Sequence, residues 1–223
     1  VVVIESVEHY LGSRYAGALP ERPKLTREEF LKKELPAQTA ADGIREDKIF
    51  SPIMVKANEE FLKNKLYAMC HAGALSETAD YAELARDCFT APGQERLLLY
   101  YHLETAYADA VEPLDYRQIH QHMEDADAML QAHGARLIFM PIVGKLDLYA
   151  PCLEDAQGRP ENPTFAGLAA APHTETFLDT KRILRQALSE GTMDLYWNDD
   201  THWSDRAQQR VGDALYDEIQ RRK

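Results

Sequence analysis

Residues 137–143 read Leu-Ile-Phe-Met-Pro-Ile-Val, seven apolar residues in a row. A strand that is apolar on both faces is typical of a central parallel strand, because helices cover a parallel sheet on both sides. Gly144 and Lys145 follow directly and begin the loop at the carboxyl end of this strand. In open α/β sheets, ligands bind at this edge. The stretch therefore predicts the core of an α/β fold and the edge at which a site is expected.

The chain on either side of this stretch alternates between helical and strand-like patterns. Before it, apolar residues at helical spacing mark a helix that ends at Gly134; they are Ile119, Met123, Ala126 and Leu130. After it come, in order, a loop rich in Pro, Gly and Ala at 150–175, a brief strand at 177–178, a helix at 181–188 between Asp179 and Gly191, a strand at 194–197, and a last helix that Ser204 caps. This order predicts a three-layer α/β sandwich with a mainly parallel sheet.

The amino-terminal half is less regular. Residues 1–4 are β-branched and predict a strand, with a turn at Glu5-Ser6 and a helix at 7–11. We interpret residues 1–223 as a single domain with a mostly helical insertion or cap at about 20–110. Within it, helices are expected at 26–35, 51–72 and 76–87, whereas 97–101 is compatible with a strand or a buried helix.

Composition excludes several classes of function. The 223 residues carry a net charge of −12, which argues against nucleic acid as a partner. No apolar run reaches the ~18 residues of a membrane span, and no signal peptide is visible, although a chain that opens on Val1 has the character of a mature or trimmed product. Glycine-rich nucleotide-binding motifs and zinc-type spacings do not occur, so no cofactor and no metal are predicted. The cysteines allow two interpretations: a disulfide between Cys70 and Cys88, or free buried thiols.

The densest group of reactive side chains lies at residues 196–204, Tyr-Trp-Asn-Asp-Asp-Thr-His-Trp-Ser. In an extended loop residues i and i+2 project to the same side, so Asp200 is placed to hold one imidazole nitrogen of His202. The other nitrogen stays free to take a proton from a nucleophile, as in a hydrolase triad. Asp199 is an alternative partner. The competing interpretation is a helix amino terminus with acidic residues, a surface histidine and a packed tryptophan.

Such a triad needs a nucleophile, for which Ser6 is the candidate. At a strand-to-helix turn, its hydroxyl would stand beside backbone N–H groups that stabilise an oxyanion. The alternative is that Ser6 only caps the helix.

Residues 115–220 resemble the SGNH-hydrolase-like domain of the alginate-type polysaccharide O-acetyltransferases (the AlgJ/AlgX-like group). The matching features are the helix before Gly134, the strand at 137–143 with Pro141 and Lys145, Tyr149-Ala150-Pro151, Phe177-Leu178-Asp179, and Leu195-Tyr196 followed by Asp200-Thr201-His202-Trp203. The resemblance implies a flavodoxin-like α/β fold, a Ser-His-Asp triad with Asp200 as acid and His202 as base, and periplasmic or secreted transfer of acetyl groups to a polysaccharide.

The chain departs from this family at the nucleophile. The family carries its serine after the D-x-H motif in a Gly-Asp-Ser-like turn, and no such turn follows here. Either Ser6 serves instead, or residues 1–11 match the family's last strand and helix, in which case Glu5 and Glu8 are the matching residues and Ser6 is incidental.

Two functions follow as expectations. The first is acetyl transfer to or from a polysaccharide, as an O-acetyltransferase or an acetylesterase, with Trp203, Tyr196 and Lys145 as substrate-binding candidates. Its partners would be the polysaccharide, an acetyl donor and other proteins of exopolysaccharide assembly. The second is a catalytically inactive module of the same fold that binds carbohydrate or serves assembly.

Overall fold

The computed structural model describes residues 1–17, 62, 66, 79–101, 104, 115–155 and 162–221. The chain divides into two compact units, one made of Val1–Ala18 with Glu77–Lys223 and the other of Leu19–Ser76. In the second unit only Leu62 and Leu66 are described; both are helical and exposed. The rest of the helices predicted at 26–35 and 51–72 lies outside the described residues. The account below concerns the first unit.

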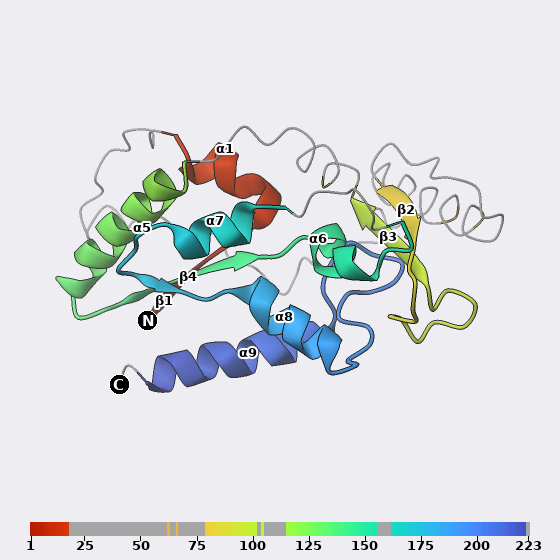
Figure 1. Ribbon diagram of the computed structural model, residues 1–223. Helices are drawn as coiled ribbons and strands as arrows, with labels where there is room; N and C mark the ends of the chain where they lie inside the picture. The colour runs from red at the N-terminus through yellow and green to blue at the C-terminus, as the bar shows by residue number, and fades with distance from the viewer. Residues whose placement is uncertain are drawn as a thin grey trace, which may run out of the picture. The chain divides into compact units, whose positions relative to one another are not determined.

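A three-stranded parallel sheet forms the centre of this unit (Figure 1). The strand order is β1 (Val2–Val7), β4 (Leu137–Ile142) and β5 (Thr176–Phe177). All six residues of β4 are buried, as predicted for a central strand. The register pairs Ile4 with Phe139 and Ser6 with Pro141. The unit is therefore a mixed α/β structure with a parallel sheet.

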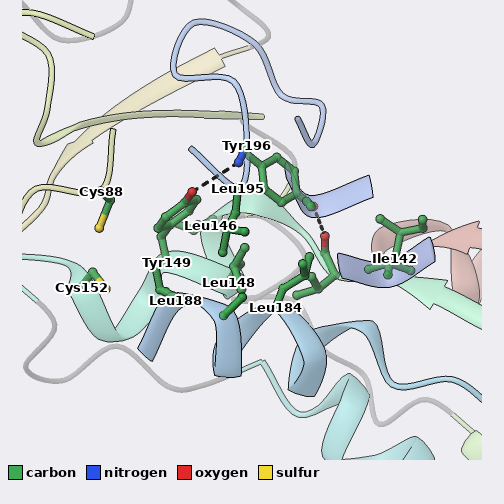
Figure 2. Close-up of a cluster of buried hydrophobic side chains, with 14 of the residues drawn as sticks. Cys88, Ile142, Leu146, Leu148, Tyr149, Cys152, Leu184, Leu188, Leu195 and Tyr196 are labelled. Atoms are coloured by element: carbon green, nitrogen blue, oxygen red, sulfur yellow. Dashed lines mark hydrogen bonds between the residues drawn. The ribbon is translucent and has the colours of Figure 1, made fainter. Parts of the chain in front are cut away.

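Helices cover both faces of β4, and the alternation of its side chains separates two cores. Leu137 and Phe139 pack with α1 (Leu11–Tyr15), α5 (Tyr116–Gln131) and α7 (Thr164–Ala170). The intervening residues, Ile138, Met140 and Ile142, join a larger core with α6 (Lys145–Tyr149), α8 (Thr180–Ser189) and α9 (Asp205–Gln220), shown in part in Figure 2. Because successive strand residues point to opposite faces, a continuously apolar strand supplies both cores.

Local signals place the helix ends where the sequence predicts them. Asp179 accepts a hydrogen bond from Arg182 N at the start of α8, and Ser204 accepts one from Arg206 N at the start of α9. Gly134 and Gly191 end their helices with positive φ angles of 73° and 86°, a conformation that costs glycine little. The last described helix begins as expected, and its residues Ala207 and Val211 are buried.

An antiparallel hairpin occupies part of the segment expected to be helical. β2 (Ala79–Glu83) pairs with β3 (Leu97–Tyr101), so the helix predicted at 76–87 is wrong over 79–83, and 97–101 is a strand. The loop predicted at 150–175 also contains the 3₁₀ turn η3 (Ala150–Cys152) and α7.

The strand predicted at 194–197 does not form. Asp194 adopts a positive φ of 55°, and its carboxylate accepts hydrogen bonds of 2.8 Å from both the backbone N–H and the hydroxyl of Thr90. The chain turns there and then folds back through an isolated bridge between Tyr196 and Trp203. In the described ranges, no helix is long and apolar enough to cross a membrane.

Candidate functional site

The loop that carries the D-x-H motif is a closed turn. Its ends are joined by hydrogen bonds from Trp197 N to His202 O at 3.1 Å and from Ser204 N to Leu195 O at 2.9 Å. Asn and Asp are common in such turns because their short polar side chains bond nearby backbone groups. Asp200 does this here, accepting a 3.0 Å hydrogen bond from His202 N. The turn thereby presents residues 198–202 at its tip.

Asp200 and His202 form the contact predicted from their spacing. Asp200 Oδ1 lies 2.6 Å from His202 Nδ1, so the motif's second aspartate, not Asp199, holds the ring. Burial acts to raise the pKa of Asp200, but the hydrogen bonds from the side chain and backbone of His202 outweigh it and lower the pKa. The carboxylate therefore stays ionised and accepts the Nδ1 proton.

The imidazole is open on its other side. The His202 side chain is 81% exposed, and within the described part of the chain Nε2 makes no hydrogen bond. A neutral ring with its proton on Nδ1 has a free lone pair on Nε2. This is the state in which histidine acts as a general base.

A cavity of about 310 Å³ adjoins this ring. Its floor contains the carboxyl ends of β1 and β4, represented by Val7, Ile142 and Val143, which is the edge where the sequence predicts a site. The polar and aromatic side chains that line it are Glu5, Glu104, His9, His202, Tyr101 and Trp203, together with Tyr10, Tyr196, Thr201 and Lys145. Carboxylates, imidazoles and aromatic rings thus line the same cavity.

Lys145 donates hydrogen bonds to the backbone of the loop that carries the D-x-H motif. Its residue is 1% exposed, and Nζ donates to the carbonyl oxygens of Trp197 at 2.6 Å and Asp200 at 2.8 Å, with Asn198 O at 3.4 Å. Burial lowers the pKa of Lys145 to about 7, against the opposing effect of Glu104, Asp200 and Asp199. Lys145, expected as a substrate-binding residue, thus borders the cavity, while its Nζ bonds the backbone of the loop.

Two carboxylates accept hydrogen bonds from the backbone at the start of α6, next to the cavity. Glu8, in the 3₁₀ turn η1 (Glu8–Tyr10), accepts a 2.8 Å hydrogen bond from Gly144 N, and Glu104 accepts one of 2.7 Å from Leu146 N. A Cβ atom on residue 144 would lie 2.7 Å from Glu104 Oε2, so glycine permits this close approach. The start of α6, and with it Lys145, is fixed by these contacts.

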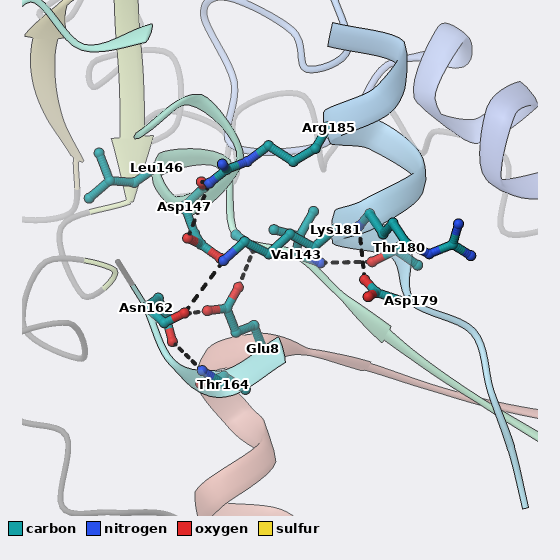
Figure 3. Close-up of polar contacts among 12 residues, drawn as sticks. Glu8, Val143, Leu146, Asp147, Asn162, Thr164, Asp179, Thr180, Lys181 and Arg185 are labelled. Atoms are coloured by element: carbon teal, nitrogen blue, oxygen red, sulfur yellow. Dashed lines mark hydrogen bonds and ion pairs between the residues drawn. The ribbon is translucent and has the colours of Figure 1, made fainter. Parts of the chain in front are cut away.

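A wider network of buried polar groups surrounds Glu8 (Figure 3). Asn162 bonds the Glu8 carboxylate and accepts from Thr164 N at 3.0 Å. Asp147 on α6 pairs with Lys181 on α8 at 2.9 Å, and Arg185 donates to the Asp147 carbonyl at 2.6 Å. Burial, followed by the charge of Asp147, raises the pKa of Glu8 to about 8. Burial likewise raises the pKa of Glu104 to about 7.

Ser6 lies elsewhere. β1 continues to Val7, so Ser6 is inside the strand and the predicted turn position is wrong. Glu5 and Val7 line the cavity, and the alternation of a strand directs the intervening residue to the other face. Ser6 is 3% exposed, and its hydroxyl has no hydrogen-bond partner among the described residues. The structure brings Asp200 and His202 together but does not bring Ser6 to the cavity.

The two aromatic candidates differ in their exposure. Tyr196 is 3% exposed, and its hydroxyl donates to Val143 O, which makes it chiefly a packing residue that also borders the cavity. Trp203 is partly exposed beside His202 and lines the cavity. Sequence reasoning missed His9, Tyr10, Tyr101 and Glu104 as lining residues, because nothing local marks the ends of separate segments as neighbours.

Substitution Lys145→Met tests the role of the ammonium. It removes the donor that bonds the carbonyls of Trp197 and Asp200, and buried carbonyls without a donor are unfavourable. We expect amide hydrogens of residues 195–204 to exchange at least ~10-fold faster, as measured by mass spectrometry. Arg136→Met, at an exposed position, is the control. Unchanged exchange in Lys145→Met with a native fold would contradict the role.

The raised pKa of Glu8 predicts how stability depends on pH. Its pKa in the folded chain, about 8, exceeds its ordinary value of 4.5, so its stabilising contribution is complete below pH 4.5 and is lost as pH rises through 8. Glu8→Gln imitates the protonated acid. From pH 5 to pH 7 the unfolding free energy of the parent should fall by about 2–3 kcal/mol more than that of the variant, as measured by urea denaturation.

The control for this measurement is Glu83→Gln, at an exposed position. It should follow the pH dependence of the parent. A Glu8→Gln variant that also follows the parent would show that Glu8 ionises normally in the folded chain.

Comparisons of the chain with protein-family models, with curated proteins and with solved structures find no match.

Proposed function

We propose that this protein transfers an acetyl group to or from a carbohydrate, with His202 as the general base and O-acetyl transfer as the favoured direction. One observation carries the proposal: the Asp200–His202 pair leaves Nε2 free beside a cavity at the carboxyl ends of parallel strands. Asp200 fixes the tautomer and stabilises the imidazolium, as the acid of a triad does.

The placement of Ser6 favours direct transfer over an acyl-enzyme. In this mechanism His202 Nε2 takes the proton of a sugar hydroxyl, and the sugar oxygen attacks the carbonyl carbon of the acetyl donor. The tetrahedral intermediate collapses, the donor's leaving group departs, and it receives the proton from the imidazolium. Water in place of the sugar gives an esterase. No protein nucleophile is needed, which agrees with a Ser6 hydroxyl buried away from the cavity.

The lining of the cavity supports a carbohydrate as the acceptor. Tyr101 and Trp203 offer aromatic faces, which suit the apolar faces of sugar rings. Glu5 and Glu104 offer carboxyl oxygens that accept hydrogen bonds from sugar hydroxyls. The ammonium of Lys145 also lines the cavity, but it already donates to backbone carbonyls. Negative charge in the lining disfavours an anionic ligand, so a neutral saccharide fits better than a uronate polymer.

The helices on both faces of the parallel sheet support an SGNH-like three-layer sandwich as the fold. From the motif resemblance we propose that the protein acts in the periplasm or outside the cell, on exported polysaccharide and with other assembly proteins.

Hydrolysis of p-nitrophenyl acetate, with and without a neutral oligosaccharide acceptor, tests the reaction. His202→Ala should lower kcat/KM by ~100-fold or more, since general-base catalysis contributes about that much. Asp200→Asn should also lower it, because the ring loses its orienting carboxylate. Ser6→Ala should stay within about twofold of the parent.

The same variants separate the rival mechanisms. If Ser6→Ala loses activity as completely as His202→Ala while keeping its circular dichroism spectrum, an acyl-serine forms and direct transfer is wrong. If the parent has no activity but binds neutral oligosaccharides in calorimetry, the protein is the catalytically inactive binding module. The burial of Ser6 is the observation that favours the catalytically inactive binding module as the second candidate function.

A further inference from the structure

A pair of buried cysteines lies outside the candidate site. Cys88 follows β2 and is 1% exposed, and Cys152 ends η3 and is 4% exposed. Ala85 N donates to Cys152 O at 2.7 Å, and Leu84 forms an antiparallel bridge with Leu153, so the two segments run side by side. Both side chains belong to the same core, at its edge in Figure 2. The two thiols lie near enough for each to affect the ionisation of the other.

An arginine is fixed against this pair. Arg86 Nε donates to Cys152 Sγ at 3.3 Å, while Nη2 donates to Leu188 O at 3.2 Å and so anchors the guanidinium to the end of α8. The arginine itself is exposed. The sulfur of Cys152 therefore lies one side chain below the surface, beside a positive charge.

We propose that Cys88 and Cys152 are a redox pair that closes to a disulfide when the protein meets a peroxide. Cys152, as the thiolate, attacks one oxygen of hydrogen peroxide, which forms a sulfenic acid and releases hydroxide. The sulfur of Cys88 then attacks the sulfenic sulfur, its proton leaves with the hydroxyl group as water, and the S–S bond forms. Two thiols and one peroxide give one disulfide and two waters.

The electrostatics assign the two roles. Arg86 Nε donates to Cys152 Sγ, and the neighbouring Cys88 thiol together with this guanidinium lowers the pKa of Cys152, while burial acts against them. The neighbouring Cys152 and burial raise the pKa of Cys88. Because the thiolate is the nucleophile, Cys152 attacks first and Cys88 resolves the sulfenic acid.

The disulfide would add a covalent link between two segments that pair through backbone hydrogen bonds at this point. Cys88 belongs to the loop between β2 and β3, and Cys152 follows α6, the helix that begins with Lys145. The cross-link closes a long loop of chain, and such links stabilise mainly by restricting the unfolded state. This inference is independent of the proposed acetyl transfer.

The test uses the whole chain with Cys70→Ser, so that only these two thiols remain. After reduction and treatment with hydrogen peroxide, intact-mass spectrometry should show the loss of two hydrogen atoms, and non-reducing peptide maps should join the peptides of Cys88 and Cys152. Oxidation should raise Tm by about 5–10 °C, reversibly with dithiothreitol. Adding Cys88→Ser should leave a sulfenic acid on Cys152 that dimedone traps.

A second variant tests the assigned order. Arg86→Met removes the charge beside Cys152, so oxidation should become several-fold slower at pH 7, and the pH profile of iodoacetamide alkylation should move upward. Two outcomes would overturn the proposal. One is that both thiols stay fully alkylatable, or pass to sulfinic acid, without a cross-link. The other is that the unmodified chain joins Cys88 to Cys70 instead.

Discussion

The buried side chain of Lys145 positions the loop that carries the candidate site of this protein. The ammonium of Lys145 bonds the carbonyl groups of Trp197 and Asp200, and so it determines where the tip of the D-x-H loop lies. An ammonium taken out of water is unfavourable unless acceptors replace its hydration. The loop backbone supplies those acceptors, so the loop and the buried lysine require each other. The orientation of His202 over the cavity is a consequence of this contact.

The lysine is itself held by the sheet. It begins α6 directly after β4, and Glu8 and Glu104 accept the backbone N–H groups of the neighbouring Gly144 and Leu146. Thr180 adds a further tie, donating to Pro141 O and accepting from Val143 N. The raised pKa values of both carboxyls and the lowered pKa of Lys145 share their largest cause, which is desolvation by burial. Such groups cluster at functional sites.

The features that the sequence predicted correctly depend on local chemistry. The apolar run of β4, the caps Asp179 and Ser204, and the i, i+2 contact of Asp200 with His202 involve residues close along the chain. The errors have a different origin. Residues 79–83 have a helical pattern, but pairing with 97–101 decides their structure, and tertiary context often overrides propensity. The buried role of Lys145 depends on carbonyls about fifty residues away.

Ser6 illustrates how small a shift decides a site. The expected strand ended before it, whereas β1 runs to Val7, and in a strand the neighbouring positions belong to opposite faces. Glu5 and Val7 reach the cavity and Ser6 does not. A hydroxyl one position away in the sequence is thus on the wrong side of the sheet. This is why the mechanism that we propose uses the imidazole alone, with the acceptor hydroxyl in place of a serine.

The protonation state of the His202 ring tests this account most directly, and long-range proton–nitrogen correlation NMR near neutral pH reads it. The account predicts that the neutral ring carries its proton on Nδ1, bonded to Asp200, and that Nε2 is unprotonated. It also predicts that Lys145→Met weakens this preference. A neutral ring protonated on Nε2, or an equal mixture of the two forms in the parent, would contradict the claim that Asp200 and Lys145 prepare a general base.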